Sequence, residues 1–544
     1  MAHYLIGIDT GGTFTDAVLI EEETARIIAS VKKPTTHQQL ARGTIAALTA
    51  LLAETGVAPG TIRTVGVSST LATNAVVENK GARVALLVIG YVRHFRLPVT
   101  AVIYIQGGHR ITGEEEQPLD LEYLVEIVNN LKGEVDAYGV CSAMSIKNPT
   151  HELVVEEAIT MIDPKPVFCS FRASGAAGMK ERAATAGLHA KLMPVMQEYL
   201  QAIAEAMAKL QLRCPVQVIG GNGRPISSDR AMEFAGATVA SGPACTARFG
   251  ALHTTGDALV IDVGGTTTDI AMIRNGAPLL APEGCRIGGW QTHVEAVNMI
   301  TAGIGGDSHA RIDDRGKIVV GPARVVPLAM AGAIPEISSW LGGGEQAKLI
   351  VGYQEGLTGQ DDEIARFLQR HGPATLQRIK EGTGLAGVPL EKRLERMTSR
   401  QRVYECGFTP TDALHVLGQI ALGDRAAAQT GAEILGSLLG LTGLEFSRRV
   451  IAATEKKIEN LLIDYVIQQY WGNSLTSFLA ERTAHPVLGV NFSLKIPLIG
   501  IGAAAQSLLP AVAARLGTTI HFPEHCEIGS AIGAAMICRD HPGV

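Results

Sequence analysis

Residues 8–16 read Ile-Asp-Thr-Gly-Gly-Thr-Phe-Thr-Asp, and residues 261–269 read Ile-Asp-Val-Gly-Gly-Thr-Thr-Thr-Asp. Both segments follow one pattern, an apolar residue and then Asp-x-Gly-Gly-Thr-x-Thr-Asp. Each follows a short apolar run and leads into another, at 17–20 and at 270–273. This arrangement predicts two β-hairpins, each with a glycine-rich turn between its strands. We name the segments the first loop and the second loop, and because the pattern occurs twice we expect two related halves.

The residue types in both loops suit a phosphate ligand. Paired glycines let the backbone approach a ligand closely, and successive backbone N–H groups form an anion-binding nest. Threonine hydroxyl groups add hydrogen-bond donors, and an aspartate at a strand end is a hard oxygen ligand for Mg²⁺. We therefore expect one nucleotide between the two loops. The residues expected to bind its phosphates are Thr10, Gly11, Gly12, Thr13, Thr15, Gly264, Gly265, Thr266 and Thr267, and Asp9 and Asp262 are expected to hold Mg²⁺ and to act in catalysis.

The pair of loops resembles the phosphate loops of the actin, Hsp70 and sugar-kinase superfamily. Within that superfamily, the amino-acid sequences of the two loops are similar to those of the hydantoinase A/5-oxoprolinase subunits. Five further segments resemble motifs of that family: Ser-Ser-Thr-Leu-Ala-Thr-Asn-Ala at 68–75, Ser-Ile-Lys-Asn-Pro-Thr-His-Glu at 145–152, Glu-Arg-Ala-Ala-Thr at 181–185, Ser-Gly-Pro-Ala at 241–244 and Thr-Pro-Thr-Asp-Ala at 409–413. Helix caps and turns are the alternative interpretation of such segments. His189 departs from the family pattern, which usually has Asn at this position.

The resemblance also implies roles for two later glycine-rich segments. Ile-Thr-Ala-Gly-Ile-Gly-Gly-Asp-Ser at 300–308 is similar to a family segment that lines the phosphate and substrate side, through Gly305 and Gly306. Asp307 in this segment is a candidate catalytic residue, because a carboxylate among backbone donors can bind Mg²⁺ or orient a nucleophile. Its alternative role is that of a turn residue before the next strand. Gly500 and Gly502 resemble the turn that lies against adenosine in the superfamily.

The resemblance implies an α/β fold with duplicated RNase H-like (actin-like ATPase) domains around a nucleotide cleft, and a helical insertion in the second half. The expected domains are residues 1–245 with the first loop, 246–335 with the second loop, 336–485 as the insertion, and 486–544 with the adenosine turn and a connecting helix. Within the insertion, residues 361–402 predict three short helices that resemble a winged helix. Such helical triplets are more often structural or protein-contact modules than DNA-binding ones.

Composition limits the possible classes of protein. The chain has 544 residues, 46% of them hydrophobic and 61 of them glycine, which suits a large α/β enzyme with many tight turns. A net charge of −6 gives no electrostatic reason to expect nucleic acid or an anionic membrane as a partner. The eight cysteines include no C-x-x-C pair, so we expect free thiols, no zinc site and a cytoplasmic protein. The first residues resemble no signal peptide, and the apolar residues 496–514 are interpreted as strand, loop and helix rather than a membrane span.

The activity implied by the resemblance is ATP-dependent activation of a cyclic amide such as a hydantoin, 5-oxoproline or another lactam. The amide oxygen would attack the γ-phosphorus, and Thr13, Thr15, Thr266 and the loop amides would stabilise the developing charge. Ring-opening hydrolysis would follow, with a hydantoinase B-type second subunit or a homo-oligomer as the expected assembly. Three alternatives remain: a subunit of an ATP-dependent ketone carboxylase, a nucleotide-gated binding or reactivase protein, and a transcription regulator that uses residues 361–402.

Overall fold

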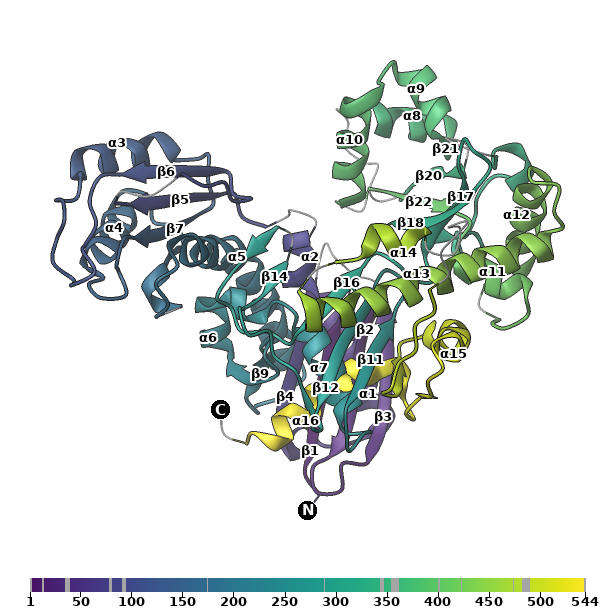
Figure 1. Ribbon diagram of the computed structural model, residues 1–544, viewed down its shortest axis with the longest axis horizontal. Coiled ribbons are helices and arrows are strands. Elements are labelled where there is room, and N and C mark those ends of the chain that lie inside the picture. Colours follow the sequence, from purple (N-terminus) through teal and green to yellow (C-terminus); the bar gives the residue numbers. More distant parts are fainter. Residues whose placement is uncertain are drawn as a thin grey trace. The chain divides into compact units, whose positions relative to one another are not determined.

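The structure, a computed structural model, describes residues 2–11, 14–34, 40–77, 81–90, 94–173, 175–287, 289–342, 347–353, 362–399, 402–421, 423–472, 474–481 and 490–542. The chain forms two compact units (Figure 1). The first unit consists of residues 1–256, 272–298 and 528–544, and the second consists of residues 257–271 and 299–527. Each unit contains one main β-sheet and smaller sheets beside it.

The main sheet of the first unit has the strand order β10-β9-β4-β1-β2-β3. Its strands are β1 (Tyr4–Thr10), β2 (Phe14–Glu21), β3 (Ile27–Pro34), β4 (Ile62–Ser69), β9 (Val216–Ile219) and β10 (Pro225–Ser227). The first three strands form an antiparallel meander that contains the predicted first hairpin, and β4 and β9 continue the sheet in parallel on the other side of β1. The first loop therefore connects β1 and β2 at one end of the central strands.

Helices α7 (Ser241–Ala251) and α16 (Gly529–Asp540) pack against each other, and α16 covers this sheet. The close approach depends on glycines in the strands: a Cβ on Gly66 would lie 2.8 Å from the backbone oxygen of Ala534, and Gly7 meets Ala531 in the same way. Gly533 likewise lies directly against the backbone of Cys245 in α7. The glycine and alanine residues of α16 thus permit close packing on the sheet and on α7.

A second, four-stranded sheet belongs to the first unit and has the order β6-β5-β7-β8, with all strands parallel. Its strands are β5 (Val84–Ile89), β6 (Ala101–Ile105), β7 (Ala137–Ser142) and β8 (Val167–Cys169). Side chains of α3 (Leu121–Leu131) and α4 (Thr150–Ile162) bury one face, and the start of α5 (Met179–Lys209) buries the other (Figure 1). Helix α5 is long and packs against β7.

The sheet of the second unit repeats the pattern of the first. Strand β11 (Ala258–Val263) lies between β12 (Thr268–Arg274) and the parallel strand β23 (Leu498–Ile501). Strand β24 (Ile520–His521) continues in parallel, and β16 (Met299–Ala302) pairs with β12 in antiparallel fashion. A hairpin joined by a glycine-rich loop, followed by parallel strands, therefore occurs in both units, which confirms the predicted duplication. The long helix α13 (Gly443–Trp471) packs on α15 (Ala505–Arg515) and on the hairpin of β17 (Ser308–Ile312) and β18 (Ile318–Arg324).

The three short helices expected in residues 361–402 are present, as α8 (Glu363–His371), α9 (Leu376–Thr383) and α10 (Gly387–Ser399). They share a small apolar core with strands β20 (Leu349–Gly352) and β22 (Val403–Gly407), which pair in antiparallel fashion. In the described residues, no helix is both long enough and apolar enough to cross a membrane. Residues 496–514 form β23, a short loop and most of α15, as the sequence predicts.

Candidate functional site

The second loop is a tight turn held against a second glycine-rich segment. The N–H of Gly264 donates to the carbonyl oxygen of Thr267 at 3.0 Å and closes the turn between β11 and β12. Gly306 donates its N–H to the Gly264 oxygen at 3.0 Å, and Asp307 donates to the Gly265 oxygen at 2.7 Å. Segment 300–308 and the second loop, which the sequence indicated separately, therefore form one structure.

Glycine is required where these two backbones meet. A Cβ on Gly305 would lie 2.5 Å from the oxygen of Gly265 and 2.6 Å from that of Gly264, closer than any side chain tolerates. Thr411, the second residue of α11 (Pro410–Val416), supports the segment from behind: its hydroxyl donates to the Gly306 oxygen at 2.8 Å. The segment Thr-Pro-Thr-Asp-Ala at 409–413 thus supports the loop, a role that its sequence alone did not reveal.

Two carboxylates border the second loop. Asp307 is mostly buried, and a Cβ on Gly265 would lie 2.6 Å from its Oδ2 atom. Burial raises the pKa of the Asp307 carboxyl group, while Arg324, whose Nη2 lies 3.4 Å from Oδ2, opposes that shift. Asp262, the second-last residue of β11, lies beside the turn that follows β23, where a Cβ on Gly502 would lie 2.5 Å from Asp262 Oδ1. The second unit therefore brings Asp262 and Asp307 to the same pair of loops.

The remaining predicted residues of the second unit differ in their surroundings. Thr266 is exposed at the tip of the second loop, where its hydroxyl can reach a ligand. Thr267 turns its hydroxyl toward the carboxyl group of Asp269. Gly500 lies under the ring of Phe522, so its missing side chain makes room for that ring. Gly502, at φ +92°, is the glycine of the expected adenosine turn that borders Asp262.

In the first unit, Asp9 lies beside the start of α2 (Leu71–Val77) and the start of α7. Its Oδ1 accepts a hydrogen bond from the hydroxyl of Ser68 at 2.7 Å. A Cβ on Gly242 would lie 3.7 Å from the same Oδ1 atom and 3.4 Å from Cγ2 of Thr70. The segments at 68–75 and 241–244 therefore meet at Asp9, which neither segment's sequence specified.

Among the described residues of the first loop, most expected donors have partners within the protein. Gly12 and Thr13 lie outside the described residues. Gly11 donates its N–H to the Phe14 oxygen at 2.9 Å and begins the turn. The side chains of Thr10 and Thr15 are buried, and the Thr10 hydroxyl lies 3.1 Å from the hydroxyl of Tyr199 in α5. Among the described residues of this loop, Thr10 and Thr15 thus stabilise the hairpin rather than present hydroxyls at its surface.

The final aspartates of the two loops are not equivalent. Asp16 pairs with Lys32 on β3, with 3.0 Å between Oδ1 and Nζ. Asp269 has hydroxyl partners from Thr267 and Thr301, and burial raises the pKa of its carboxyl group to about 6. The duplicated halves therefore share a backbone pattern but differ in electrostatics at the same motif position.

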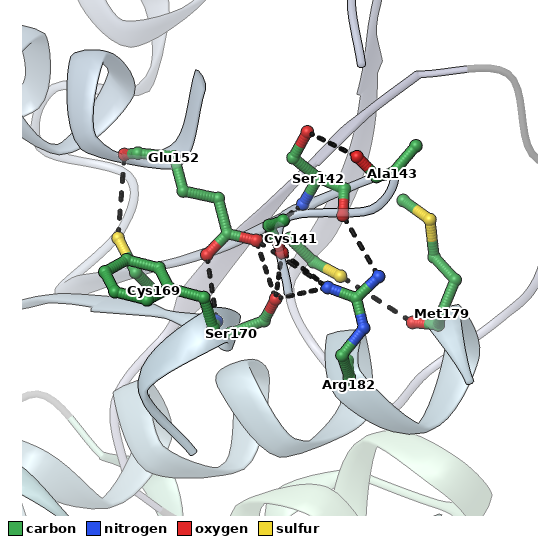
Figure 2. Close-up of polar contacts among 10 residues, drawn as sticks. Cys141, Ser142, Ala143, Glu152, Cys169, Ser170, Met179 and Arg182 are labelled. Atoms are coloured by element: carbon green, nitrogen blue, oxygen red, sulfur yellow. Dashed lines mark hydrogen bonds and ion pairs between the residues drawn. The ribbon is translucent and has the colours of Figure 1, made fainter. Parts of the chain in front are cut away.

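Two further predicted motifs meet in a buried polar network of the first unit, shown in Figure 2. Glu152 and Arg182 are both completely buried. Glu152 accepts hydrogen bonds from the Ser142 N–H at 2.7 Å and the Ser170 hydroxyl at 2.6 Å, and Arg182 donates to the hydroxyl of Ser145 and the oxygen of Ser142. The network ties the ends of β7 and β8 to α4 and α5. Burial raises the pKa of the Glu152 carboxyl group, and these hydrogen bonds oppose the shift.

The neighbouring histidines also have structural partners. Nδ1 of His151 accepts the N–H of Gly108 at 2.9 Å, and its Nε2 lies 2.9 Å from Glu115. His189 stacks on Phe168 and accepts the N–H of Gly236 at 3.0 Å, and burial lowers the pKa of its imidazole to about 3. Residues of the segments at 145–152 and 181–185 thus make structural contacts within the first unit.

The candidate metal ligands are isolated carboxylates and do not form a preformed cluster. Within the described ranges, no group of three or more His, Cys, Asp or Glu side chains is placed to hold a metal. Asp9 and Asp262 still fit Mg²⁺, which usually binds one or two carboxylates and completes its shell with water and phosphate oxygens. The eight cysteines are free thiols, as expected.

Comparisons with known proteins extend over most of the chain. The model for the N-terminal region of the hydantoinase/oxoprolinase family matches residues 5–162, and the hydantoinase/oxoprolinase model matches residues 182–436. The alpha subunit of caprolactamase from Pseudomonas jessenii is 27% identical over 365 residues, which cover 59% of this chain and 50% of the relative. The gamma subunit of acetophenone carboxylase from Aromatoleum aromaticum is 28% identical over 400 residues, covering 64% of this chain and 53% of the relative. The chain spans about half the length of the curated relatives it matches.

Two solved structures share the fold. Nucleotide-free acetone carboxylase has a TM-score of 0.68 at 20% identity, and the ATP-dependent caprolactamase from Pseudomonas jessenii has a TM-score of 0.63 at 20% identity. Each comparison covers 98% of this chain and 70% of the other chain. The expected fold class, α/β with duplicated actin-like halves, is confirmed.

Proposed function

Because the chain belongs to the hydantoinase/oxoprolinase family, we propose that it activates a cyclic amide with ATP as one subunit of a multi-subunit enzyme. The observation that carries this proposal is the packing of segment 300–308 on the second loop, which gathers glycine backbone around Asp262 and Asp307. The alpha subunit of caprolactamase, one of the relatives, favours a lactam as the substrate class. Both relatives are named as single subunits of larger enzymes, and this favours a second subunit for this chain as well.

The second unit offers suitable partners for a nucleotide. Where Gly265, Gly305 and Gly502 lie, a Cβ would meet neighbouring atoms at 2.5–2.6 Å, so the backbone itself lines the site. Glycine-rich turns of this kind present N–H groups to phosphate oxygens. We assign the phosphates to the second loop, with Gly306 and Thr266 at its sides, and adenosine to the turn at Gly502.

ATP would supply a phosphoryl group that converts the amide oxygen into a good leaving group. The residues of this chain would provide the surroundings for that transfer. Thr266 and the loop N–H groups would stabilise negative charge where it develops. Asp262 would hold Mg²⁺ through one oxygen and through water, and in the first unit Asp9 is a candidate for the same role. Asp307, held in place by Arg324, would orient the attacking group.

Ketone carboxylation is the second candidate function. The gamma subunit of acetophenone carboxylase is as similar to this chain as the caprolactamase subunit. Both reactions would start well from an activated carbonyl oxygen, so the same loops could serve either. A substrate panel separates the two, because only a ketone carboxylase requires bicarbonate together with its ketone.

The test is ADP release by the purified chain with Mg·ATP, alone and with hydantoins, 5-oxoproline, other lactams, and ketones with bicarbonate. Stimulation by a cyclic amide would support the proposal, and stimulation only by a ketone with bicarbonate would replace it with the second candidate. Asp262→Asn should abolish the stimulation. Asp313→Asn is the matched control, because Asp313 lies in an exposed turn of the same unit. Mg·ATP binding that no compound converts into ADP release, even with a copurified second subunit, would contradict the proposal.

A further inference from the structure

The N-terminus of helix α7 borders Asp9 and begins in a strained conformation. Gly242, the second residue of α7, lies beside Asp9 and Thr70, as the 3.7 Å and 3.4 Å distances from its Cβ position show. Ala240 precedes the helix at φ 64°, in the left-handed region that residues with a side chain rarely adopt. Its N–H donates to the hydroxyl of Thr73 at 3.0 Å, which holds this conformation. Backbone strain of this kind gathers at functional sites.

This helix end leaves several donors without an acceptor. Ala240 has no side-chain oxygen with which to cap α7. Within the described chain, the N–H groups of Ser241 and Gly242 donate no hydrogen bond, and Pro243 has no N–H. The hydroxyl of Ser241 is buried, with 1% of the residue exposed, and it also lacks a partner in the part of the chain that the structure describes.

An unpaired buried hydroxyl costs free energy, which a ligand that accepts its hydrogen would offset. The free N–H groups and the helix dipole favour an anion at this position. Asp9 is itself negative, so an anion beside it requires a cation between the two. Mg²⁺ at Asp9 would meet this condition.

We propose that Ser241 and the first turn of α7 bind an oxygen of a phosphoryl group. The group is either the γ-phosphoryl of ATP or the phosphate released after transfer. The inference rests on the proposed function, in which Asp9 holds Mg²⁺, and it adds a binding element that the two loops do not contain.

The experiment measures binding, by calorimetry on the full chain, of Mg·ADP, Mg·AMP-PNP, and inorganic phosphate in the presence of Mg·ADP. Ser241→Ala should weaken one of the last two about tenfold, the effect of losing one hydrogen bond to a charged group, and leave Mg·ADP unchanged. Weaker binding of Mg·AMP-PNP identifies the γ-phosphoryl group as the ligand. Weaker binding of inorganic phosphate identifies the phosphate released after transfer as the ligand.

Ser227→Ala is the matched control, since Ser227 caps helix α6 (Ser228–Glu233) through a hydrogen bond to the N–H of Arg230. It should melt at a lower temperature and bind all ligands normally. Ser241→Ala should keep the wild-type melting temperature, because it removes an unpaired hydroxyl and no cap, and it should bind AMP-PNP or phosphate more weakly. Gly242→Ala has room for its methyl group yet places it beside Asp9, so it too should fold normally and bind AMP-PNP or phosphate more weakly.

If Ser241→Ala and Gly242→Ala bind all three ligands like the wild type, the inference is wrong and the proposed function stands. A Ser241→Ala melting temperature below that of Ser227→Ala, with unchanged binding, would likewise show a structural hydroxyl. If the wild-type chain binds neither Mg·ADP nor Mg·AMP-PNP, the proposed function fails, and the inference fails with it.

Discussion

The guanidinium of Arg182 lies 4.0 Å from the carboxylate of Glu152, and neither side chain exposes any surface (Figure 2). Two charges out of water are tolerable only when each is compensated, here by the other and by serine hydroxyls and backbone groups. The pair connects the first turns of α4 and α5 to the ends of β7 and β8. It therefore fixes the four-stranded sheet of the first unit to the helices on both of its faces.

Removing one partner of this pair should be strongly destabilising. We expect Arg182→Met to lower the free energy of unfolding by about 3–5 kcal/mol, because it leaves the Glu152 charge buried alone. Urea denaturation of the full chain, followed by fluorescence and circular dichroism, measures the change. The double variant Glu152→Gln/Arg182→Met should lose less than the sum of the single variants, since neither charge then remains unpaired.

Arg172→Met is the matched control for that series. Arg172 pairs with Glu156 at 2.7 Å in the same part of the chain, but both side chains keep more than a fifth of their surface exposed. Such pairs contribute about 1 kcal/mol or less. An effect of Arg182→Met no larger than that of Arg172→Met would contradict the structural role of the buried pair.

The contact between Gly305 and the second loop gives a steric prediction. Gly305→Ala places a Cβ about 2.5 Å from two carbonyl oxygens, so one of the loops must move. We expect a loss of about 1–3 kcal/mol in stability, as for other overpacked sites, and loss of the Mg·ATP-induced rise in melting temperature. Gly60→Ala, at a position with open space around it, should melt and respond like the wild type. A normal Mg·ATP response in Gly305→Ala would remove Gly305 from the binding site.

Much of the fold was predictable because its signals are local. The strand, glycine turn and strand pattern of each loop lies within about ten residues, and its repetition revealed the duplication. A helix start at 409–413 was also visible as an alternative interpretation, because the segment Thr-Pro-Thr-Asp-Ala is short and local.

The contacts that the sequence could not predict join distant positions. Tyr199 reaches the Thr10 hydroxyl from the interior of a long helix, where its spacing indicates only a buried face. Phe522 covers Gly500 because β24 returns beside β23, so a glycine expected at adenosine also makes room for an aromatic ring. Arg324 reaches Asp307 from β18, and nothing in its sequence surroundings sets it apart from other surface arginines. Residue type indicated the chemistry of the site, whereas the contacts between distant residues depended on the three-dimensional fold.

His189 should make the protein sensitive to acid. Its pKa is about 3 in the folded state and 6.5 in its ordinary state, so below pH 6.5 the unfolded chain binds a proton that the folded chain refuses. Stability is fully present above pH 6.5 and falls as the pH is lowered toward 3. Between pH 7 and pH 5 the loss should be about 2 kcal/mol from this residue.

His189→Asn removes the titrating group, so its stability should change less between pH 7 and pH 5 than that of the wild type. Urea midpoints at both pH values measure the difference. His525→Asn, which removes a partly exposed imidazole, is the control and should keep the wild-type dependence. Equal pH dependence in wild type and His189→Asn would show that the imidazole is protonated in the folded protein.

The pairing of Asp307 with Arg324 predicts a shift in the pH profile of ADP release. Burial raises the pKa of Asp307 and Arg324 lowers it, so Arg324→Met should raise it further. If Asp307 acts as a carboxylate, the acid limb of the profile then moves to higher pH, because a proton occupies the group over a wider range. Arg324→Lys keeps the positive charge and should restore most of the wild-type profile. Arg315→Met, at an exposed turn of the same hairpin, should leave the profile unchanged. A uniform drop in rate for Arg324→Met, with the acid limb at its original pH, would mean that Arg324 supports the loop and that Asp307 does not titrate in the reaction.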